Sequence, residues 1–158
     1  VIGTVGSDEK IKTAQQYGCS QVINYNKDDF QKEVMRITND EGIPVVYDGV
    51  GKVTMEKSLM CLQMRGTFVS FGNASGKLDP VDVGKLIAPK GLFLTRPSIA
   101  HYTATREELD EAASKLFEMI KSKKVVVNLY KKYSLNEVVQ AHKDLEGRKI
   151  IGPAIIIP

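Results

Sequence analysis

Cysteine, histidine and long apolar runs are scarce in this chain of 158 residues, and each scarcity excludes a class of protein. Cys19 and Cys61 form no CxxC pattern, so neither a disulfide framework nor a zinc knuckle is expected. His101 and His142 lie too far apart for a local metal motif, and we assign no metal. The longest apolar runs, such as residues 154–157, are far too short to span a membrane. Two free thiols of this kind indicate a cytoplasmic protein in which both stay reduced.

Concentrated charge is lacking as well. The net charge is only +3, charged residues make up 26% of the chain and hydrophobic residues 42%, values typical of a soluble globular protein. Since no basic block carries interleaved aromatic residues, nucleic acid is not expected as the main ligand. No basic-then-apolar leader is visible at the start of the chain. The length suits one domain with a sizeable core.

Strand-like and helix-like patterns alternate along the chain. Short apolar runs predict strands at residues 1–5, 21–25, 45–47, 66–71, 91–95, 125–129 and 150–157. Helical spacing of apolar residues predicts helices between most of them, and two helices follow capping-box pairs, Thr105 with Glu108 and Ser134 with Glu137. The run at 45–47 suits a strand buried on both faces. Strands that alternate with helices predict an α/β fold with a parallel sheet and right-handed crossovers.

The loop after the first strand has the residues of a phosphate site. NAD-binding folds usually end this strand with an acidic residue that binds the ribose hydroxyls, but Gly6 and Ser7 stand here and Lys10 follows one helical turn later. A hydroxyl, free N–H groups and an ammonium at a helix start suit a phosphate dianion, which favours NADPH with its 2′-phosphate. Alternatively, Ser7 only caps the helix, Asp8 and Glu9 complement its dipole, and Lys10 is solvated.

Two further loops follow later strands of the predicted sheet, at the edge where ligands bind in open parallel sheets. In residues 48–51, two glycines flank Val50 and permit close approach to a flat ligand, or simply form a tight turn. Residues 71–76 combine an aromatic ring, small residues and the Asn73 amide, which suits a nicotinamide carboxamide or a mobile surface loop. Tyr25, Tyr102 and Lys77 are proton donors only in principle, so the catalytic residues stay unknown.

Five runs, in unbroken order from end to end, carry a family resemblance: VIGTVGSDEK, QVINYNKDDF, VVYDGVGKVTMEKSLMCLQMRGTFVSFGNASG, LTRPSIAHYTATREEL and GRKIIGPAIIIP. They closely resemble quinone oxidoreductases of the zeta-crystallin type, in the zinc-independent branch of the medium-chain dehydrogenase/reductase superfamily. The resemblance implies NADPH as the cofactor and hydride transfer to a quinone or another α,β-unsaturated carbonyl. It also implies a homodimer, formed through an edge strand that runs from Gly91 to Arg96.

The resemblance assigns cofactor contacts residue by residue. Ser7 and Lys10, in the loop that Gly6 opens, would bind the 2′-phosphate, and Tyr25 would lie beside the adenosine. The remaining implied contacts are Val50 and Gly51 along the cofactor, Phe71, Gly72 and Asn73 near the nicotinamide, and Arg148 at the cofactor phosphates.

These residues lack three parts of the family pattern: a preceding GroES-like catalytic domain, the first strand, and its glycine-rich loop. We therefore expect an incomplete doubly wound, Rossmann-like sheet in a fragment that is catalytically incomplete. Residues 1–124 would form a partial NADPH-binding domain, and residues 125–158 would pack on the absent catalytic domain. Because the first strand is central in the order 3-2-1-4-5-6, the strands at 1–5 and 45–47 would either pair directly or leave an apolar gap with two unpaired edges.

Two other functions compete with this interpretation. One is a non-enzymatic nucleotide-binding or interaction module, and the other is a fragment of an enoyl-thioester reductase from the same superfamily.

Overall fold

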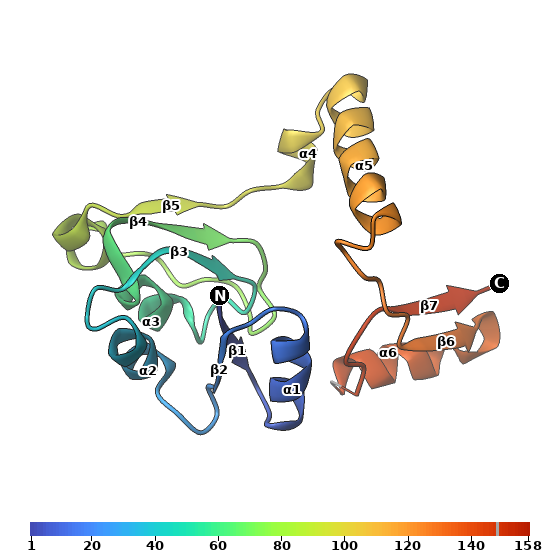
Figure 1. Cartoon of the computed structure of the whole chain (residues 1–158), viewed down its shortest axis with the longest axis horizontal. Helices are drawn as coiled ribbons and strands as arrows, with labels where there is room; N and C mark the ends of the chain where they lie inside the picture. Colours follow the sequence, from blue (N-terminus) through green and yellow to red (C-terminus); the bar gives the residue numbers. More distant parts are fainter. Residues whose placement is uncertain (148) are drawn as a thin grey trace. The chain divides into compact units, whose positions relative to one another are not determined.

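The computed structural model describes residues 1–147 and 149–158, which form two compact units, Val1–His101 and Tyr102–Pro158 (Figure 1). Each unit has its own parallel strand pairing. The predicted division at residues 124 and 125 refers to packing on a further domain, so it stays a prediction.

The first unit contains two parallel sheets. β1 (Ile2–Val5) leads through helix α1 (Glu9–Gln16) to β2 (Gln21–Asn24), and the two strands pair in parallel. β3 (Ile43–Asp48), β4 (Leu62–Ser70) and β5 (Phe93–Thr95) form the second sheet in that order, again all parallel. The predicted α/β fold with parallel strands is therefore confirmed.

β1 and β3 do not pair with each other anywhere in the described residues. Of the two arrangements expected from the sequence, the structure adopts the one that leaves an edge of each strand without a ladder partner. Helix α2 (Phe30–Ile37) packs against strands of both sheets and connects them through side-chain contacts. Its Phe30 and Val34 are buried with Ile23 of β2, and partly buried Ile2 and Val46, from β1 and β3, pack on the same cluster. Burial of each such side chain contributes roughly 1.5–3 kcal/mol, so packing rather than strand pairing holds the two sheets together.

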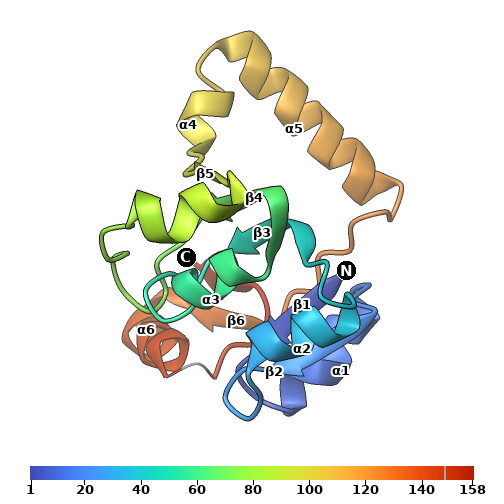
Figure 2. The same cartoon turned by 90° about the vertical axis from the view of Figure 1, so that its left-hand side faces the viewer.

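Helix α3 (Met55–Met60) covers one face of the three-stranded sheet (Figure 2). The core on this face is formed by buried residues of α3, of β4 and of the position just before β5: Met55, Leu59, Leu62, Phe68 and Leu92. Leu86 and Ile87, from a π-helical turn at Val83–Ile87, pack against it, and a 3-10 turn at Ala88–Lys90 follows.

The other face of this sheet is open within the unit. Tyr47 of β3 is 74% exposed and Val45 is 40% exposed, so the prediction that residues 45–47 are buried on both faces is wrong. An apolar run indicates a strand, but the number of layers that cover the strand depends on which other segments pack on it. β4 also begins earlier than predicted, at Leu62, because this residue pairs with Ile43 rather than extending α3.

The second unit pairs β6 (Lys131–Ser134) with β7 (Ala154–Ile157) in parallel, with Tyr133 opposite Ile156. Its helices are α5 (Arg106–Lys121) and α6 (Val138–Glu146), while α4 (Ile99–Tyr102) spans the boundary between the units and a 3-10 turn at Leu135–Glu137 precedes α6. No helix in the described parts of the chain is both long and apolar enough to cross a membrane.

Both predicted capping boxes are present. The Glu108 N–H donates to the Thr105 hydroxyl at 3.2 Å, and the Glu108 carboxylate accepts from the Thr105 N–H at 3.0 Å. Ser134 and Glu137 form the second box. The strand predicted at residues 125–129 is wrong, because the ladder to β7 starts at Lys131 and leaves Val126 and Val127 more than half exposed.

Candidate functional site

The loops that follow β1 and β2 are tied together. The Asn26 side-chain amide donates to the Gly6 carbonyl at 2.7 Å, and the Tyr25 N–H donates to the Val5 carbonyl at 3.1 Å. A Cβ atom at Gly6 would lie 2.8 Å from the Tyr25 hydroxyl, so only glycine lets the tyrosine ring lie against this loop. The structure thus brings three predicted site residues, Gly6, Ser7 and Tyr25, to one edge of the β1–β2 sheet.

Asp8 is the carboxylate of this loop, and both of its oxygens have partners. Its Oδ1 accepts from the Asn24 amide at 2.7 Å, and its Oδ2 accepts from the Lys27 ammonium. The hydrogen bond from Lys27 lowers the pKa of Asp8 most, and the hydrogen bond from Asn24 lowers it further. The bond to Asp8 in turn raises the pKa of Lys27. The carboxylate is therefore charged and directed to the loop after β2.

Unlike the Asp8 carboxylate, the side chains of Ser7 and Lys10 are not engaged by any described residue of the neighbouring loop. Among the residues that the structure describes, neither the Ser7 hydroxyl nor the Lys10 ammonium has a hydrogen-bond or ion-pair partner. α1 begins at Glu9, its N-cap residue is Asp8, and no side-chain hydrogen bond caps it, so Ser7 does not act as its cap. A hydroxyl and an ammonium are thus both available to an anion at the start of α1.

The loop after β3 is organised by a buried carboxylate. Asp48 is 5% exposed and accepts hydrogen bonds at 2.8 Å from the N–H groups of Val50 and Gly51. The hydroxyls of Thr54 and Ser58 donate to its other oxygen at 2.8 and 2.9 Å. One side chain therefore fixes the turn at residues 49–51 and the start of α3 together.

This turn is also bound to the loop after β4. The Ser75 hydroxyl donates to the Val50 carbonyl at 2.7 Å and accepts from the Val53 N–H at 3.1 Å. Gly51 has a φ of +92°, and a Cβ there would meet the Asn73 Cα at 3.2 Å. A Cβ at Gly72 would lie only 2.6 Å from the Gly49 carbonyl oxygen. The predicted residues Val50, Gly51, Gly72 and Asn73 thus form one closely packed group.

Arg96 holds the far side of this group. Its guanidinium donates to the Ser70 hydroxyl at 2.9 Å and to the Asn73 side-chain oxygen at 3.3 Å, so Asn73 is held through its oxygen. The Phe71 ring lies against Gly49 and is 60% exposed. Arg148, the last predicted cofactor contact, lies outside the described residues.

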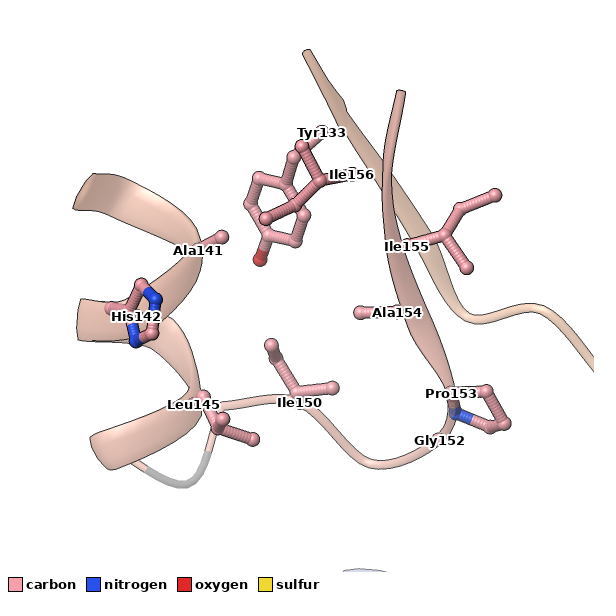
Figure 3. Close-up of a pocket in the computed structure, with 10 residues that line it drawn as sticks. All are labelled: Tyr133, Ala141, His142, Leu145, Ile150, Gly152, Pro153, Ala154, Ile155 and Ile156. Atoms are coloured by element: carbon pink, nitrogen blue, oxygen red, sulfur yellow. The ribbon is translucent and has the colours of Figure 1, made fainter. Parts of the chain in front are cut away.

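A separate cavity of about 330 Å³ lies in the second unit between α6 and β7 (Figure 3). Its walls are mainly apolar, and the Tyr133 ring points into it from β6. The Tyr133 hydroxyl donates to Asp144 at 2.8 Å, and Lys131 and Gln140 donate to the same carboxylate. Hydrogen bonds from Tyr133, Gln140 and Lys131 lower the pKa of Asp144 to about 2, while desolvation raises the pKa of Tyr133. This network stabilises the unit, and no predicted site residue belongs to it.

Comparison with known proteins assigns the family. A family model described as "Zinc-binding dehydrogenase" matches residues 1–122. The chain belongs to this family. Among its relatives, quinone oxidoreductase 1 of Escherichia coli is 44% identical over 100% of this chain and 49% of its own length. A 2-haloacrylate reductase of Burkholderia is 42% identical over 100% of the chain and 48% of its own length. The resemblance to quinone oxidoreductases is thus confirmed.

The family fold is confirmed by solved structures. The Escherichia coli quinone oxidoreductase crystallised with NADPH superimposes with a TM-score of 0.94, at 44% identity, over 99% of this chain and 49% of that one. The chain spans about half the length of the curated relatives it matches.

The family description mentions zinc, a metal that proteins hold with cysteine, histidine and carboxylate side chains. In the described ranges, no three side chains of histidine, cysteine, aspartate or glutamate come together as a metal centre would require. Cys19 is half-buried and Cys61 is buried, and both are free thiols. The described residues therefore do not fit a bound metal.

Several residues of the site were not singled out from the sequence. In the sequence Asp48 only opens a glycine turn, although hydroxyls six and ten residues later are its partners. The serine and threonine spacing along α3 was an available signal. No local pattern pointed to Lys27 as the partner of Asp8, because 19 residues separate them.

Proposed function

We propose that this chain is the NADPH-binding portion of a quinone oxidoreductase that transfers a hydride from NADPH to a quinone or another α,β-unsaturated carbonyl. The observation that carries the proposal is a pair of donors, Ser7 and Lys10, that have no partner among the described residues and follow Gly6, against which Tyr25 lies. The similarity to a quinone oxidoreductase crystallised with NADPH supports it. The 2-haloacrylate reductase relative supports an activated carbon–carbon double bond as a further acceptor.

In this proposal each predicted residue has a role along the cofactor. Ser7 and Lys10, which follow the turn at Gly6, bind the 2′-phosphate, and Tyr25 lies beside the adenosine. The remaining proposed contacts are Val50 and Gly51 along the ribose and nicotinamide path, Phe71, Gly72 and Asn73 at the nicotinamide, and Arg148 at the phosphates. The bound cofactor supplies the hydride, while these residues bind and orient it.

The substrate pocket is proposed to lie mostly outside this chain, which makes the chain by itself catalytically incomplete. Residues 125–158 are proposed to pack on the further domain that completes the enzyme. Exposed apolar side chains along this segment, among them Val127, Ile155 and Ile156, support that packing. Since Cys19 and Cys61 are free thiols, a reducing compartment such as the cytoplasm suits the protein.

A homodimer through the segment from Gly91 to Arg96 is part of the same proposal. β5 pairs with β4 on one side and has no ladder partner on the other among the described residues. Phe93 and Leu94 on this strand are 61% and 43% exposed. A Leu94→Pro variant, which removes one N–H from the edge, should sediment as a monomer if the dimer forms through this strand.

The experiment that tests the function is a titration of NADPH and NADH, followed by fluorescence, into the chain and into a Lys10→Ala variant. We expect the parent chain to prefer NADPH and Lys10→Ala to reduce that preference. Lys12→Ala, which removes an exposed lysine from the same helix, is the matched control. Equal affinity for both cofactors, or an unchanged NADPH affinity in Lys10→Ala, contradicts the proposed 2′-phosphate site.

Turnover assays separate the enzyme from a non-enzymatic nucleotide-binding module. We expect no quinone reduction by the 158-residue chain alone and measurable reduction when the remaining half of a related enzyme is supplied in the same polypeptide. NADPH binding without turnover in the completed polypeptide would favour the non-enzymatic module. Preferential reduction of an enoyl thioester by the completed polypeptide would favour the enoyl-thioester reductase.

A further inference from the structure

The loop that supplies Ser7 and Lys10 also contains a carboxylate, Asp8, directly next to Ser7. An uncompensated carboxylate at this place would repel a phosphate dianion and would instead suit the free hydroxyls of a ribose. Asp8 therefore has to be compensated if the loop is to accept a 2′-phosphate. This argument rests on the proposed function.

The structure supplies the compensation from the neighbouring loop. Lys27, which follows β2, donates its ammonium to one oxygen of Asp8, and Asn24 donates its amide to the other at 2.7 Å. Asn24 is 5% exposed, and its own side-chain oxygen accepts from the Asn26 N–H at 3.1 Å. Because both the NH₂ group and the oxygen of its side-chain amide are hydrogen-bonded, Asn24 is fixed in place and holds the Asp8 carboxylate on the β2 side.

We propose that Asp8 and Lys27 form a neutralising pair, oriented by Asn24, that makes the loop selective for an adenosine with a 2′-phosphate. Lys27 is then a specificity-determining residue that acts through Asp8 rather than on the cofactor. Lys10 stays the one cation of the loop free to bind the ligand among the described residues, while Glu9 is exposed to solvent.

By its exposure this pair is an ordinary surface ion pair. Lys27 and Asp8 are both more than half exposed, and such pairs contribute little to stability. Lys27 and Asn24 instead hold the Asp8 carboxylate on the β2 side. Without Lys27 this carboxylate would be free to turn toward a phosphate bound at Ser7 and Lys10, and like charges a few ångströms apart repel even in water. The expected effect of the pair is therefore on ligand choice and not on folding.

The test uses ligands that report on the adenosine end alone, adenosine 2′,5′-diphosphate and adenosine 5′-monophosphate, titrated calorimetrically into the 158-residue chain. Four forms are compared: the parent chain, Lys27→Gln, Asp8→Asn and the double variant. Lys27→Gln should weaken the 2′,5′-diphosphate about three- to sixfold at low ionic strength and change the 5′-monophosphate less than about twofold. In the Asp8→Asn background the same substitution should have almost no effect on either ligand.

Lys85→Gln is the matched control, because Lys85 is an exposed lysine of the same unit that pairs with a carboxylate, Glu56, at 3.8 Å. It should leave both affinities unchanged. Circular dichroism of all forms should coincide, since the substituted side chains are exposed.

Three outcomes overturn the inference, and they differ from one another. An equal loss on Lys27→Gln with and without Asp8 would mean that Lys27 acts on the phosphate by its own charge or by contact, and not through Asp8. An unchanged preference in Lys27→Gln would mean that the pair has no influence on selectivity. A parent chain that binds both ligands equally contradicts the proposed function itself, and this inference with it, before any variant is compared.

Discussion

The carboxylate of Asp48 accepts a hydrogen bond at 2.9 Å from the hydroxyl of Ser58, which lies one turn further along α3 than Thr54. With the donors Thr54, Val50 and Gly51, the buried end of β3 is thus joined to the turn and the helix that follow it. In the described side chains no buried polar atom lacks a hydrogen-bond partner, so this network is complete. A complete network fixes the turn that faces the loop after β4.

Removal of the Asp48 carboxylate should therefore destabilise the first unit strongly. Asp48→Ala leaves two buried hydroxyls and two N–H groups without their acceptor, and we expect a loss of about 2–4 kcal/mol in the free energy of unfolding. Urea unfolding measures it. Asp79→Ala, which removes an exposed carboxylate paired with Lys52, should change stability by less than about 0.5 kcal/mol. Equal effects of the two substitutions would contradict the role of the network.

A side chain at Gly72 should force apart the loops that follow β3 and β4. Its Cβ would lie 2.6 Å from the Gly49 carbonyl oxygen, a backbone atom that cannot rotate away. We expect Gly72→Ala to cost about 1–3 kcal/mol and to weaken NADPH binding in the same titration. At Gly84 the nearest atom is 3.5 Å away and belongs to the Asp82 side chain, so Gly84→Ala should be tolerated. If both variants unfold at the same urea concentration, the two loops do not approach as closely as described.

Acid should weaken the second unit through Asp144. Hydrogen bonds from Tyr133, Gln140 and Lys131 lower its pKa from 3.8 to about 2, so the folded state favours the ionised form. The stability that Asp144 contributes is fully present above about pH 4 and is lost as the pH falls toward 2. Thermal unfolding of the parent chain and of Asp144→Asn should therefore differ most near neutral pH and converge in acid.

The control for this pH dependence is Glu111→Gln on α5. Lys115 lowers the pKa of Glu111 as well, but the pair is exposed and contributes little. Its difference from the parent chain should stay small at every pH. A difference for Asp144→Asn that does not shrink in acid would contradict the lowered pKa.

The two thiols should differ in reactivity. Burial raises the pKa of Cys61 to about 11, and since the thiolate is the nucleophile, Cys61 should resist alkylation in the folded protein. Cys19 is only half-buried and should react first with iodoacetamide, as peptide mass spectrometry can determine. In Cys19→Ser, alkylation should await the addition of denaturant. Rapid labelling of Cys61 in the folded chain would show that α3 opens readily.

Much of the fold was predictable because local patterns carry it. The capping boxes at Thr105 and Ser134 depend on residues three positions apart, and the structure has both. The alternation of apolar strands with helices was enough to predict parallel pairing. The strand expected at 125–129 failed for a different reason, since an apolar run indicates burial but not which segment will supply a ladder partner.

The candidate site also contains some residues that the sequence indicates and others that it does not. The sequence predicts a phosphate site at Gly6, Ser7 and Lys10, which stays a prediction, and close approach of a ligand at Gly49 and Gly51. It did not indicate that Asp48 would organise one loop or that Arg96 would bind the Asn73 side chain, since 23 residues separate that pair. Contacts of this kind depend on how strands are ordered in the sheet.

The sequence by itself determined the order of elements, the parallel class of the fold, the capping boxes and the residue types of the loop after β1. Only the tertiary structure decided that β1 and β3 stay unpaired in the described residues, that Tyr47 is exposed, and that Lys27 neutralises Asp8. Periodicity and capping arise from interactions within a few residues, which sequence spacing expresses directly. Strand partners and ion pairs between loops arise from burial and charge brought together over long separations, and only the folded chain selects among them.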